Sequence, residues 1–346
     1  MFSPGGAILI RIPTTIKVNP VLNPIIENAY KVLDGGALTR AEALEIAEKI
    51  EGEEILDLIS LANKVRRKFA REITPCSILN AKSGVCSQNC RFCAQSGHHN
   101  TGIETYDLLP AEQVLEAARR AYENGVRAFG YVTSGFGYKT PTPEFRKILD
   151  TLDLLHRELP DLKICVSIGI LSRETAKLLA EHHAWRYNMN LQTSPKRYAE
   201  LISDTHTIEE KIATIRYLQE FGVTNCTGGI LGLGENWEDR VDMAFAIREL
   251  DVDGAPLNVL LPIKGTPLEG REIMAPADVA KAFAIFRLVN PTKMIKFAAG
   301  RETVMKDFQG LLMLSGLNSM ITGGYLTTRG RSVEDDVKFI EQLNRF

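Results

Sequence analysis

The segment LKICVSIGILSRETAKLLAEHHAWRYNMNLQ, residues 162–192, contains one complete strand–helix–strand unit. Residues 162–171 are rich in apolar and β-branched side chains, which is typical of a strand buried on both faces. Residues 172–183 place apolar side chains at helical spacing, and residues 186–192 predict a second strand. A helix between two such strands indicates a parallel sheet whose helices lie outside it.

The same alternation of strand and helix runs from residue 74 to the end of the chain. Strands are predicted at residues 75–81, 126–135, 162–171, 186–192, 224–235, 255–267, 294–302 and 320–327. The helices that follow them are predicted at residues 109–125, 142–159, 172–183, 207–222, 237–250, 275–290, 308–319 and 332–346. Eight such units over about 270 residues predict a closed (β/α)8 TIM barrel of the α/β class, with an open doubly wound sheet as the alternative.

Residues 39–72 precede this alternation and predict two helices. Apolar residues recur there every three or four positions, and Thr39 is placed to cap the first helix. We therefore expect an N-terminal helical extension over residues 1–72 and a barrel over residues 73–346.

The composition excludes several classes of protein. Hydrophobic residues make up 45% of the chain, charged residues 24%, and the net charge is −2, so neither nucleic acid nor a membrane surface is expected as a partner. No apolar run reaches the roughly 18–20 residues that a membrane span needs, and the start lacks the cationic segment of a secretory signal. Six cysteines in a chain of this length are not a disulfide scaffold. We expect a cytoplasmic protein whose clustered cysteines bind metal or do chemistry.

Three of the cysteines lie in the short segment SGVCSQNCRFCAQSG, residues 83–97, directly after the first predicted strand. Cys86, Cys90 and Cys93 have the spacing C-x3-C-x2-C, at the end of a barrel strand where active sites are expected. Thiolates are soft ligands that suit iron–sulfur clusters and zinc. A zinc site would take His98 or His99 as a further ligand. Three cysteines in one compact loop instead favour three corners of a [4Fe–4S] cluster with one open iron.

This loop resembles the signature of the radical S-adenosylmethionine superfamily, including the aromatic Phe92 before the last cysteine. The resemblance implies a [4Fe–4S] cluster held by Cys86, Cys90 and Cys93, with S-adenosylmethionine on its open iron. It further implies that S-adenosylmethionine is cleaved to a 5′-deoxyadenosyl radical, which abstracts hydrogen from an unactivated C–H bond.

Further segments resemble the biotin synthase family in their order and approximate spacing. Within residues 40–346 they are CRFCAQS, YNMNLQTSP, CTGGILGLGE, LNVLLPIKGTPL, FAAGRE, GLNSMITGGYLTT and EDDVKFI. The resemblance implies that sulfur is inserted into the small molecule dethiobiotin and comes from an auxiliary iron–sulfur cluster inside the barrel. It also implies a flavodoxin or ferredoxin as electron donor and a homodimer.

The expected auxiliary site departs from the family pattern of three cysteines and one arginine around a [2Fe–2S] cluster. Cys165 and Cys226 match two of the cysteines, but Phe129 stands where the family has the third. Lys296 replaces the arginine, and lysine is a poorer ligand because its ammonium must first lose a proton. Cys76, on the neighbouring strand, is placed to replace the missing thiol. We hypothesise that Cys76, Cys165 and Cys226 hold a remodelled, cubane-like cluster; the alternative is three inert buried thiols.

The resemblance also assigns residues to the cofactor and the substrate. Those expected near S-adenosylmethionine are Phe92, Asn188, Asn190, Gln192, Gly228, Gly229 and Glu235. Those expected near the substrate are Arg127, Asn258, Thr327 and Thr328. Gln192 replaces a family aspartate and Gly254 is a further departure, which leaves open a different substrate or sulfur source.

Three alternative functions remain open at this point. One is a radical enzyme that converts an octanoyl chain on a carrier protein or peptide into a lipoyl group. A second is an isomerase, lyase or cofactor-assembly enzyme with the first cluster alone. The third is a zinc-stabilised binding module, which leaves the barrel-wide resemblance unexplained.

Overall fold

The computed structural model describes residues 22–323, 326 and 331–346, and in it eight parallel strands close into a barrel. In barrel order the strands are β1 (Thr74–Lys82), β2 (Ala128–Thr133), β4 (Lys163–Ser167), β6 (Arg186–Asn188), β7 (Thr224–Cys226), β9 (Gly254–Val259), β10 (Met294–Phe297) and β11 (Ser319–Ile321). Each strand pairs with the next, and β11 pairs with β1, so the ring is complete. The predicted (β/α)8 barrel is confirmed, and the open-sheet alternative is wrong.

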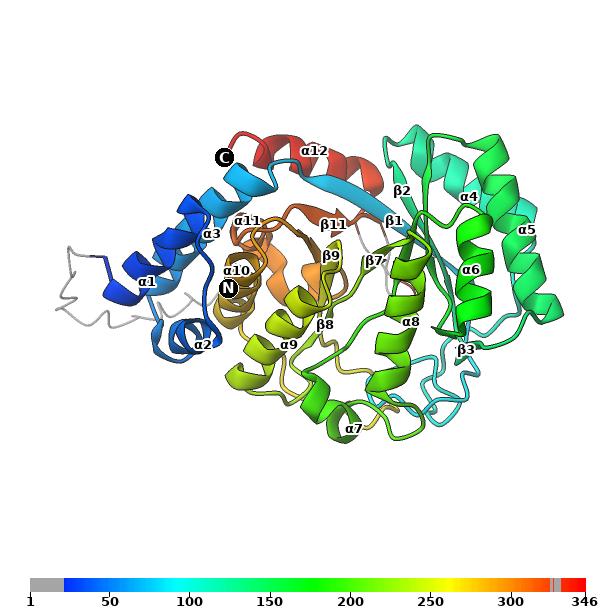
Figure 1. Cartoon of the computed structure of the whole chain (residues 1–346), viewed down its shortest axis with the longest axis horizontal. Helices are drawn as coiled ribbons and strands as arrows, with labels where there is room; N and C mark the ends of the chain where they lie inside the picture. The colour runs from blue at the N-terminus through cyan, green and yellow to red at the C-terminus, as the bar shows by residue number, and fades with distance from the viewer. Residues whose placement is uncertain (1–21, 324–325, 327–330) are drawn as a thin grey trace, which may run out of the picture.

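A helix follows each barrel strand and packs on the outside of the ring (Figure 1). These helices are α4 (Ala111–Glu123), α5 (Pro143–Glu158), α6 (Arg173–Glu181), α8 (Ile208–Glu220), α9 (Trp237–Glu249), α10 (Pro276–Val289), α11 (Gln309–Leu314) and α12 (Val333–Leu343). In α5, for example, Ile148, Leu152 and Leu155 are fully buried at helical spacing. The helical faces that the periodicity predicts are therefore the faces that cover the strands.

Two predicted strands are interrupted in the structure. The stretch 224–235 forms β7 and then β8 (Gly229–Leu231), and β8 pairs with β9 at the edge of the ring. The stretch 162–171 breaks at Gly169, whose φ is +87°, and β5 (Ile170–Leu171) pairs instead with β3 (Gly137–Tyr138). A Cβ on Gly169 would lie 2.4 Å from the carbonyl oxygen of Phe136, so only glycine permits this turn.

The N-terminal extension lies along one side of the barrel (Figure 1). It consists of α1 (Pro24–Ala29), the 3-10 turn η1 (Tyr30–Asp34), α2 (Arg40–Lys49) and α3 (Glu54–Phe69). The two predicted helices are confirmed, with Thr39 capping α2, whereas α1 was not predicted. Helix α3 packs on α10, and α2 packs on α9 and α10. The extension ends at Phe69, so the predicted boundary after residue 72 falls in the connection to β1.

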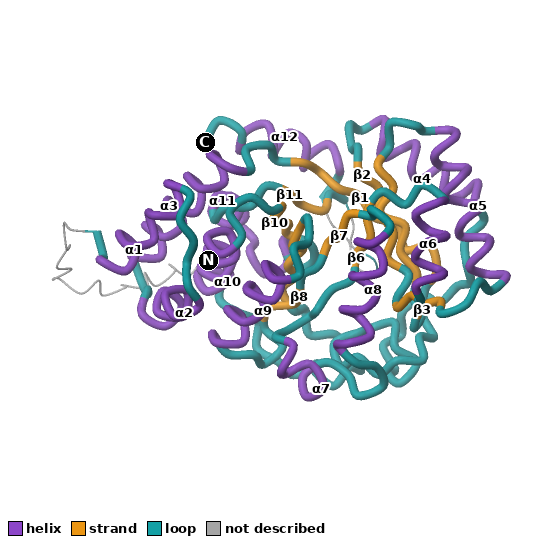
Figure 2. The backbone as a smooth tube through the Cα atoms, in the orientation of Figure 1, coloured by secondary structure: helices purple, strands orange, loops and turns teal. Residues whose placement is uncertain are grey.

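The barrel has two different ends because all its strands run the same way. We call the end where the strands finish the mouth and the end where they begin the floor. Loops gather at the mouth, on the lower side of Figure 2. Short turns on these loops are η2 (Pro195–Arg197), α7 (Tyr198–Leu201), η3 (Arg301–Met305) and η4 (Lys306–Phe308). Among the described residues, no helix combines the length and apolarity that crossing a membrane requires.

Candidate active site

One cavity inside the barrel brings all six cysteines of the chain together. Its volume is about 290 Å³, and it shares lining residues with a second cavity of about 140 Å³. Cys86, Cys90 and Cys93 are half-buried, whereas Cys76, Cys165 and Cys226 are buried. The structure therefore sorts the cysteines into an outer and an inner group of three.

The outer group lies on the loop that follows β1. Backbone hydrogen bonds fold this loop back on itself: Cys86 N–H donates to Gln95 O (2.9 Å) and Gly97 N–H donates to Cys86 O (2.7 Å). Cys93 N–H closes a turn onto Cys90 O (2.9 Å). These bonds hold the three thiols on one side of a compact loop, at the cavity.

The two histidines of the zinc alternative do not line this cavity. His98 Nε2 lies 3.0 Å from Ser87 O, and His99 Nε2 lies 3.0 Å from Cys90 O. A ring nitrogen that donates to a carbonyl carries its proton and is not free to bind a metal. In the part of the chain that the structure describes, no three His, Cys, Asp or Glu side chains surround a single metal-ion position. The histidine contacts favour the cluster interpretation of the loop over zinc.

The inner group forms one level of the barrel interior. Cys165 pairs with Gly130 of β2, which pairs with Ile78 of β1, two positions after Cys76. Because the strands tilt, residues at the same height along the barrel axis are offset from the hydrogen-bonded register by about one position per strand. From β1 to β4 is two strands, so the residue level with Cys165 is Cys76, two positions before Ile78. Applying the same offset to the remaining strand pairings places Cys226 of β7 and Lys296 of β10 at this height as well. Alternate strands thus contribute one four-membered layer, as TIM barrels do: Cys76, Cys165, Cys226 and Lys296.

This layer, which we call the thiol layer, is electrostatically unusual. Lys296 is only 6% exposed, and burial alone would lower its pKa, but the neighbouring Cys76, Cys226 and Cys165 sulfurs outweigh burial and raise it. The neighbouring Cys165 thiol and the Lys296 ammonium lower the pKa of Cys76. The Cys76 thiol and burial raise the pKa of Cys165 well above its ordinary value. The layer therefore favours negative charge on sulfur beside a lysine cation.

The structure corrects the expected position of the missing family cysteine. Phe129 is buried in the core and does not line the cavity, whereas its neighbour Gly130 does. Successive residues of a strand point to opposite faces, so the interior position of β2 belongs to Gly130. A Cβ on Gly130 would lie 2.8 Å from Cγ2 of Ile78, so the side chain of β1 occupies the space beside this glycine.

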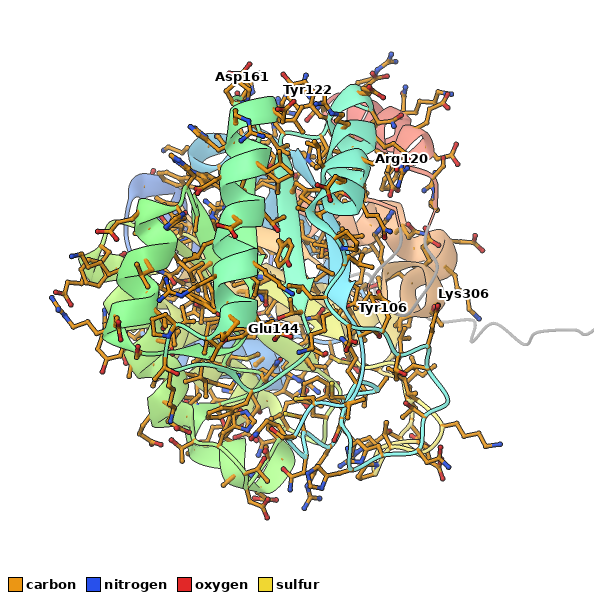
Figure 3. All side chains as sticks on the ribbon, turned by 90° about the vertical axis from the view of Figure 1, so that its right-hand side faces the viewer. Tyr106, Arg120, Tyr122, Glu144, Asp161 and Lys306 are labelled. Carbon is orange, nitrogen blue, oxygen red and sulfur yellow. The ribbon has the colours of Figure 1, made fainter. Side chains whose placement is uncertain are left out.

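Arg127, expected near the substrate, lies outside the cavity at the floor end. It is exposed, donates to the carbonyl oxygens of Tyr122 and Val126, and stacks over the Tyr122 ring at 4.1 Å. Figure 3 shows Tyr122 and Asp161 at the upper end of the molecule, with Tyr106 and Glu144 toward the loops below. The expectation for Arg127 is therefore wrong, because it precedes β2 and its side chain turns away from the interior.

The residues expected near S-adenosylmethionine separate into two kinds. Phe92, Asn188, Asn190 and Gln192 line the cavity. Gln192 has a left-handed backbone with φ +72°, and its buried Oε1 atom has no hydrogen-bond partner among the residues that the structure describes. A strained residue with an unsatisfied buried acceptor is typical of a ligand-binding position.

The glycines and Glu235 shape the backbone around that position. Asn190 Oδ1 accepts a hydrogen bond from Gly228 N–H (3.1 Å), and Gly229 forms an isolated bridge with Gln192. A Cβ on Gly228 would lie 1.9 Å from Pro256 O, so this close approach requires glycine. Glu235 corrects our expectation of a cofactor contact. It does not line the cavity, because its carboxylate is occupied by backbone N–H groups (Gly232, 2.8 Å; Gly234, 3.1 Å) and by Arg240 (2.8 Å).

Among the residues expected near the substrate, Asn258 lines both cavities. Its Nδ2 donates to Gly229 O (3.1 Å), and its Oδ1 accepts from Ala299 N–H (2.9 Å). Asn258 thereby ties β9 to the two neighbouring strand ends. The other two expected residues, Thr327 and Thr328, lie outside the described residues.

Three cavity residues were missed by sequence reasoning: Arg186, Lys211 and His206. Lys211 is buried, donates to Asn190 O (3.2 Å), and has a pKa lowered by burial. Burial lowers the pKa of His206 to about 4, and its Nε2 contacts the Tyr198 hydroxyl at 2.7 Å. For Arg186 and Lys211 the sequence signal was a charged residue within a predicted strand or helix, whereas His206 lies on the loop before α8. With Lys296, the described lining has three cations and no carboxylate, so the cavity favours anions.

Comparison with known proteins shows the family to which this chain belongs. Residues 81–247 match the radical SAM superfamily, and residues 256–345 match the biotin and thiamin synthesis associated domain. A biotin synthase of Pelodictyon phaeoclathratiforme is 54% identical over 332 residues, which cover 94% of this chain and 98% of that protein. A biotin synthase of Chlorobium phaeovibrioides is 56% identical over 326 residues, with 94% and 98% covered.

Solved structures with a similar fold are more distant in sequence. Methylornithine synthase superposes with a TM-score of 0.79 at 18% identity, covering 92% of this chain and 96% of that one. The hydrogenase maturase HydG of Carboxydothermus hydrogenoformans gives 0.76 at 17% identity, covering 92% and 78%. At these identities the likeness concerns the fold alone.

Proposed function

Because the chain belongs to the biotin synthase family of radical S-adenosylmethionine enzymes, we propose that it inserts sulfur into dethiobiotin to form biotin. The observation that carries this proposal is the single cavity with two separate groups of three cysteines. One group suits a cluster that binds S-adenosylmethionine, and the other suits a cluster that supplies sulfur.

The outer thiols fit a [4Fe–4S] cluster, because three soft ligands on one compact loop face the cavity. Cys86, Cys90 and Cys93 would hold it, and with S-adenosylmethionine it supplies the radical that removes hydrogen from carbon. The unsatisfied Oε1 of Gln192 is available to accept a hydrogen bond from a ribose hydroxyl. Lys211, buried among neutral groups, is suited to pair with the carboxylate of S-adenosylmethionine.

The inner thiols fit the auxiliary cluster, because Cys76, Cys165 and Cys226 form one level of the interior and favour negative charge on sulfur. This cluster supplies the sulfur atom. Lys296 occupies the fourth place of the thiol layer and would be a poor ligand, because its ammonium must lose a proton before it can bind iron. Three thiolates without an arginine favour a cubane-like cluster over a [2Fe–2S] cluster.

The remaining residues would orient the substrate and keep water away. Asn188 and Asn258 line the cavity with amide side chains, which both donate and accept hydrogen bonds. They would therefore suit the ureido ring of the substrate, which also offers donors and acceptors. Apolar lining residues such as Ile78 and Val132 would exclude water around the reacting carbons. We further propose a cytoplasmic homodimer that receives electrons from a flavodoxin or ferredoxin.

The cluster assignment is tested by iron and acid-labile sulfide analysis of anaerobically reconstituted protein. Wild type should hold about eight irons per chain, and a Cys76→Ala/Cys165→Ala/Cys226→Ala variant about four. A Cys86→Ala/Cys90→Ala/Cys93→Ala variant is the matched control and should lose the other four or so. Equal iron in wild type and the first variant would overturn the auxiliary site.

The substrate assignment is tested by incubation with reductant, S-adenosylmethionine and either dethiobiotin or an octanoyl-lysyl peptide. Dethiobiotin should raise 5′-deoxyadenosine above background and yield biotin, whereas the peptide should do neither. Stimulation by the peptide alone would replace the proposed function with lipoyl formation.

A further inference from the structure

Arg186 lies directly beneath the thiol layer, in a level of the barrel made otherwise of very small residues. The strand pairings that define the thiol layer place one residue from each intervening strand just below it: Ala128, Arg186, Gly254 and Ser319. Three small side chains leave space at the barrel axis, and the long side chain of Arg186 is the group that lines the cavity from this level.

The contacts of Arg186 hold its guanidinium across the floor and leave its charge without a partner. Its Nε donates to Thr224 Oγ1 (3.1 Å), and one terminal nitrogen lies 3.6 Å from Met294 Sδ. The guanidinium stacks over the Trp185 ring at 4.1 Å. Among the described residues no carboxylate pairs with Arg186, and none lines the cavity. A guanidinium has five N–H donors, so most of them remain free for an anion.

Only one further level separates Arg186 from solvent at the floor. Of its four members, Thr74 and Lys163 are exposed, and Thr224 and Met294 are half-buried. Arg186 itself is also half-buried, whereas Lys296 above it is almost fully enclosed. The floor is thus thin and carries a positive charge on its inner side. The mouth, in contrast, is the end that the outer cysteines and Gln192 assign to S-adenosylmethionine.

We propose that the floor is a second entrance to the cavity, where Arg186 captures hydrosulfide and passes it to Lys296 at the thiol layer. The inference rests on the proposed function, because an enzyme that gives up a sulfur atom at each turnover needs sulfur resupplied. A route through the floor keeps that supply separate from the substrate and S-adenosylmethionine at the mouth. Two cations in succession give a small anion a favourable path into an interior that otherwise excludes charge.

The transfer needs no co-reactant. Hydrosulfide already carries sulfur at the oxidation level of sulfide, so no electrons move when it takes its place beside the thiols. Cys76, Cys165 and Cys226 would hold the cluster whose iron takes up the sulfur, and the H–S bond of hydrosulfide would break with its proton leaving to water at the floor. The positive charges of Arg186 and Lys296 favour the anion that remains.

The decisive experiment follows radioactive sulfide, not product. Reconstituted protein is taken through one turnover, desalted anaerobically, and given ³⁵S-hydrosulfide, and the acid-labile label retained per chain is measured against concentration. Arg186→Met, which preserves length but removes charge, should need roughly tenfold more hydrosulfide for half-maximal uptake. Arg186→Lys should remain close to wild type. Arg127→Met is the matched control, because Arg127 also stacks on an aromatic ring at 4.1 Å but lies outside the cavity.

The route itself is tested in wild type by filling the mouth. Saturating S-adenosylmethionine and dethiobiotin, without reductant, should leave the rate of sulfide uptake unchanged. Uptake that stops under these conditions, or that is equal in Arg186→Met and wild type, overturns the floor entrance without affecting the proposed function. Wild-type protein that retains no label and forms no biotin would instead mean that the proposed function has failed.

Anion capture can also be measured without any cluster. The chain has two tryptophans, so a Trp237→Phe background leaves Trp185, stacked on Arg186, as the sole tryptophan whose emission is followed. Iodide should quench Trp185 several-fold more effectively in this background than after Arg186→Met, whereas neutral acrylamide should quench both equally. Identical iodide quenching would show that Arg186 attracts no anion.

Discussion

The side chains of Cys76 and Cys165 lie at the same level of the barrel interior although β2 runs between their strands. The level geometry of a TIM barrel brings side chains of alternate strands together at the axis. The intervening β2 contributes Gly130 just above this level, and Gly130 has no side chain to separate the two sulfurs. The inner cysteine group therefore depends on a glycine as much as on its thiols.

Gly130→Ala should destabilise the apo protein by about 1–3 kcal/mol, because overpacking a filled interior costs about this much. The added methyl group would meet Ile78 Cγ2 at 2.8 Å. Chemical denaturation of the apo protein measures the change. In a double-mutant cycle, the losses of stability caused by Gly130→Ala and Ile78→Ala should be less than additive, because Ile78→Ala removes the atom that clashes.

Gly310→Ala is the control for this prediction. Gly310 lies in α11, and no atom lies within 4 Å of the position of an added Cβ. Alanine should therefore be neutral or stabilise the helix by up to about 1 kcal/mol. Equal costs at Gly130 and Gly310 would show that contact with Ile78 is irrelevant.

Gln192→Leu should weaken binding of S-adenosylmethionine roughly tenfold, because it removes a buried acceptor that the described residues leave unsatisfied at the cavity. Equilibrium dialysis with the reconstituted protein in the absence of reductant measures the affinity. Thr193→Val is the matched control: the Thr193 hydroxyl is also buried without a partner, but Thr193 does not line the cavity. An equal loss in both variants would point to a general disturbance of the loop.

The sequence predicted the barrel and the outer cysteine group because both depend on local patterns. Strand–helix alternation is visible residue by residue, and the C-x3-C-x2-C spacing lies within one loop. The face of β2 was not predictable in the same way. A strand covered on both sides is apolar throughout, so Phe129 and Gly130 give no alternation to show which one points inward.

Levels of the interior combine residues that are far apart in the chain. Arg186 was missed for this reason: its inward position depends on the register of β4, β6 and β7, not on its neighbours in sequence. Glu235 was misassigned because a carboxylate in a glycine-rich segment can bind either ligand or loop backbone, and only the fold shows that it binds the loop. The position of Cys76 on a strand near Cys165 could be predicted because strand adjacency in a closed barrel follows directly from chain order.

The N-terminal extension should make stability sensitive to acid through Glu42. Hydrogen bonds from Lys31, from the Thr39 backbone and from Asn28 lower the pKa of Glu42 from about 4.5 to about 2. Between these values the unfolded chain binds the proton more readily than the folded chain, so this stabilisation is complete above pH 4.5 and is lost as pH falls toward 2. Because Glu42 is partly exposed, Glu42→Gln should cost about 1 kcal/mol at pH 7 and progressively less below pH 4.5.

Urea unfolding at several pH values checks this, with Glu45→Gln as the control. Among the described residues Glu45 pairs with Lys49 of the same helix, and both are exposed, so removing its charge should cost less than removing that of Glu42. A Glu42→Gln penalty that stays constant from pH 7 to pH 3 would contradict the proposed carboxylate network.

Asn258 should prove to be both a structural and a substrate-binding residue, and two substitutions separate the roles. Asn258→Ala removes both hydrogen bonds that join β9 to Gly229 and Ala299, and leaving those buried groups unpaired should cost about 2–4 kcal/mol. Asn258→Asp keeps the acceptor for Ala299 N–H but sets a carboxylate oxygen against Gly229 O. If Asn258 also contacts the ureido group, the folded Asp variant should bind dethiobiotin at least roughly tenfold more weakly, with unchanged affinity for S-adenosylmethionine. Calorimetric titration of each ligand measures both effects, and an equal loss of the two affinities would leave Asn258 a purely structural residue.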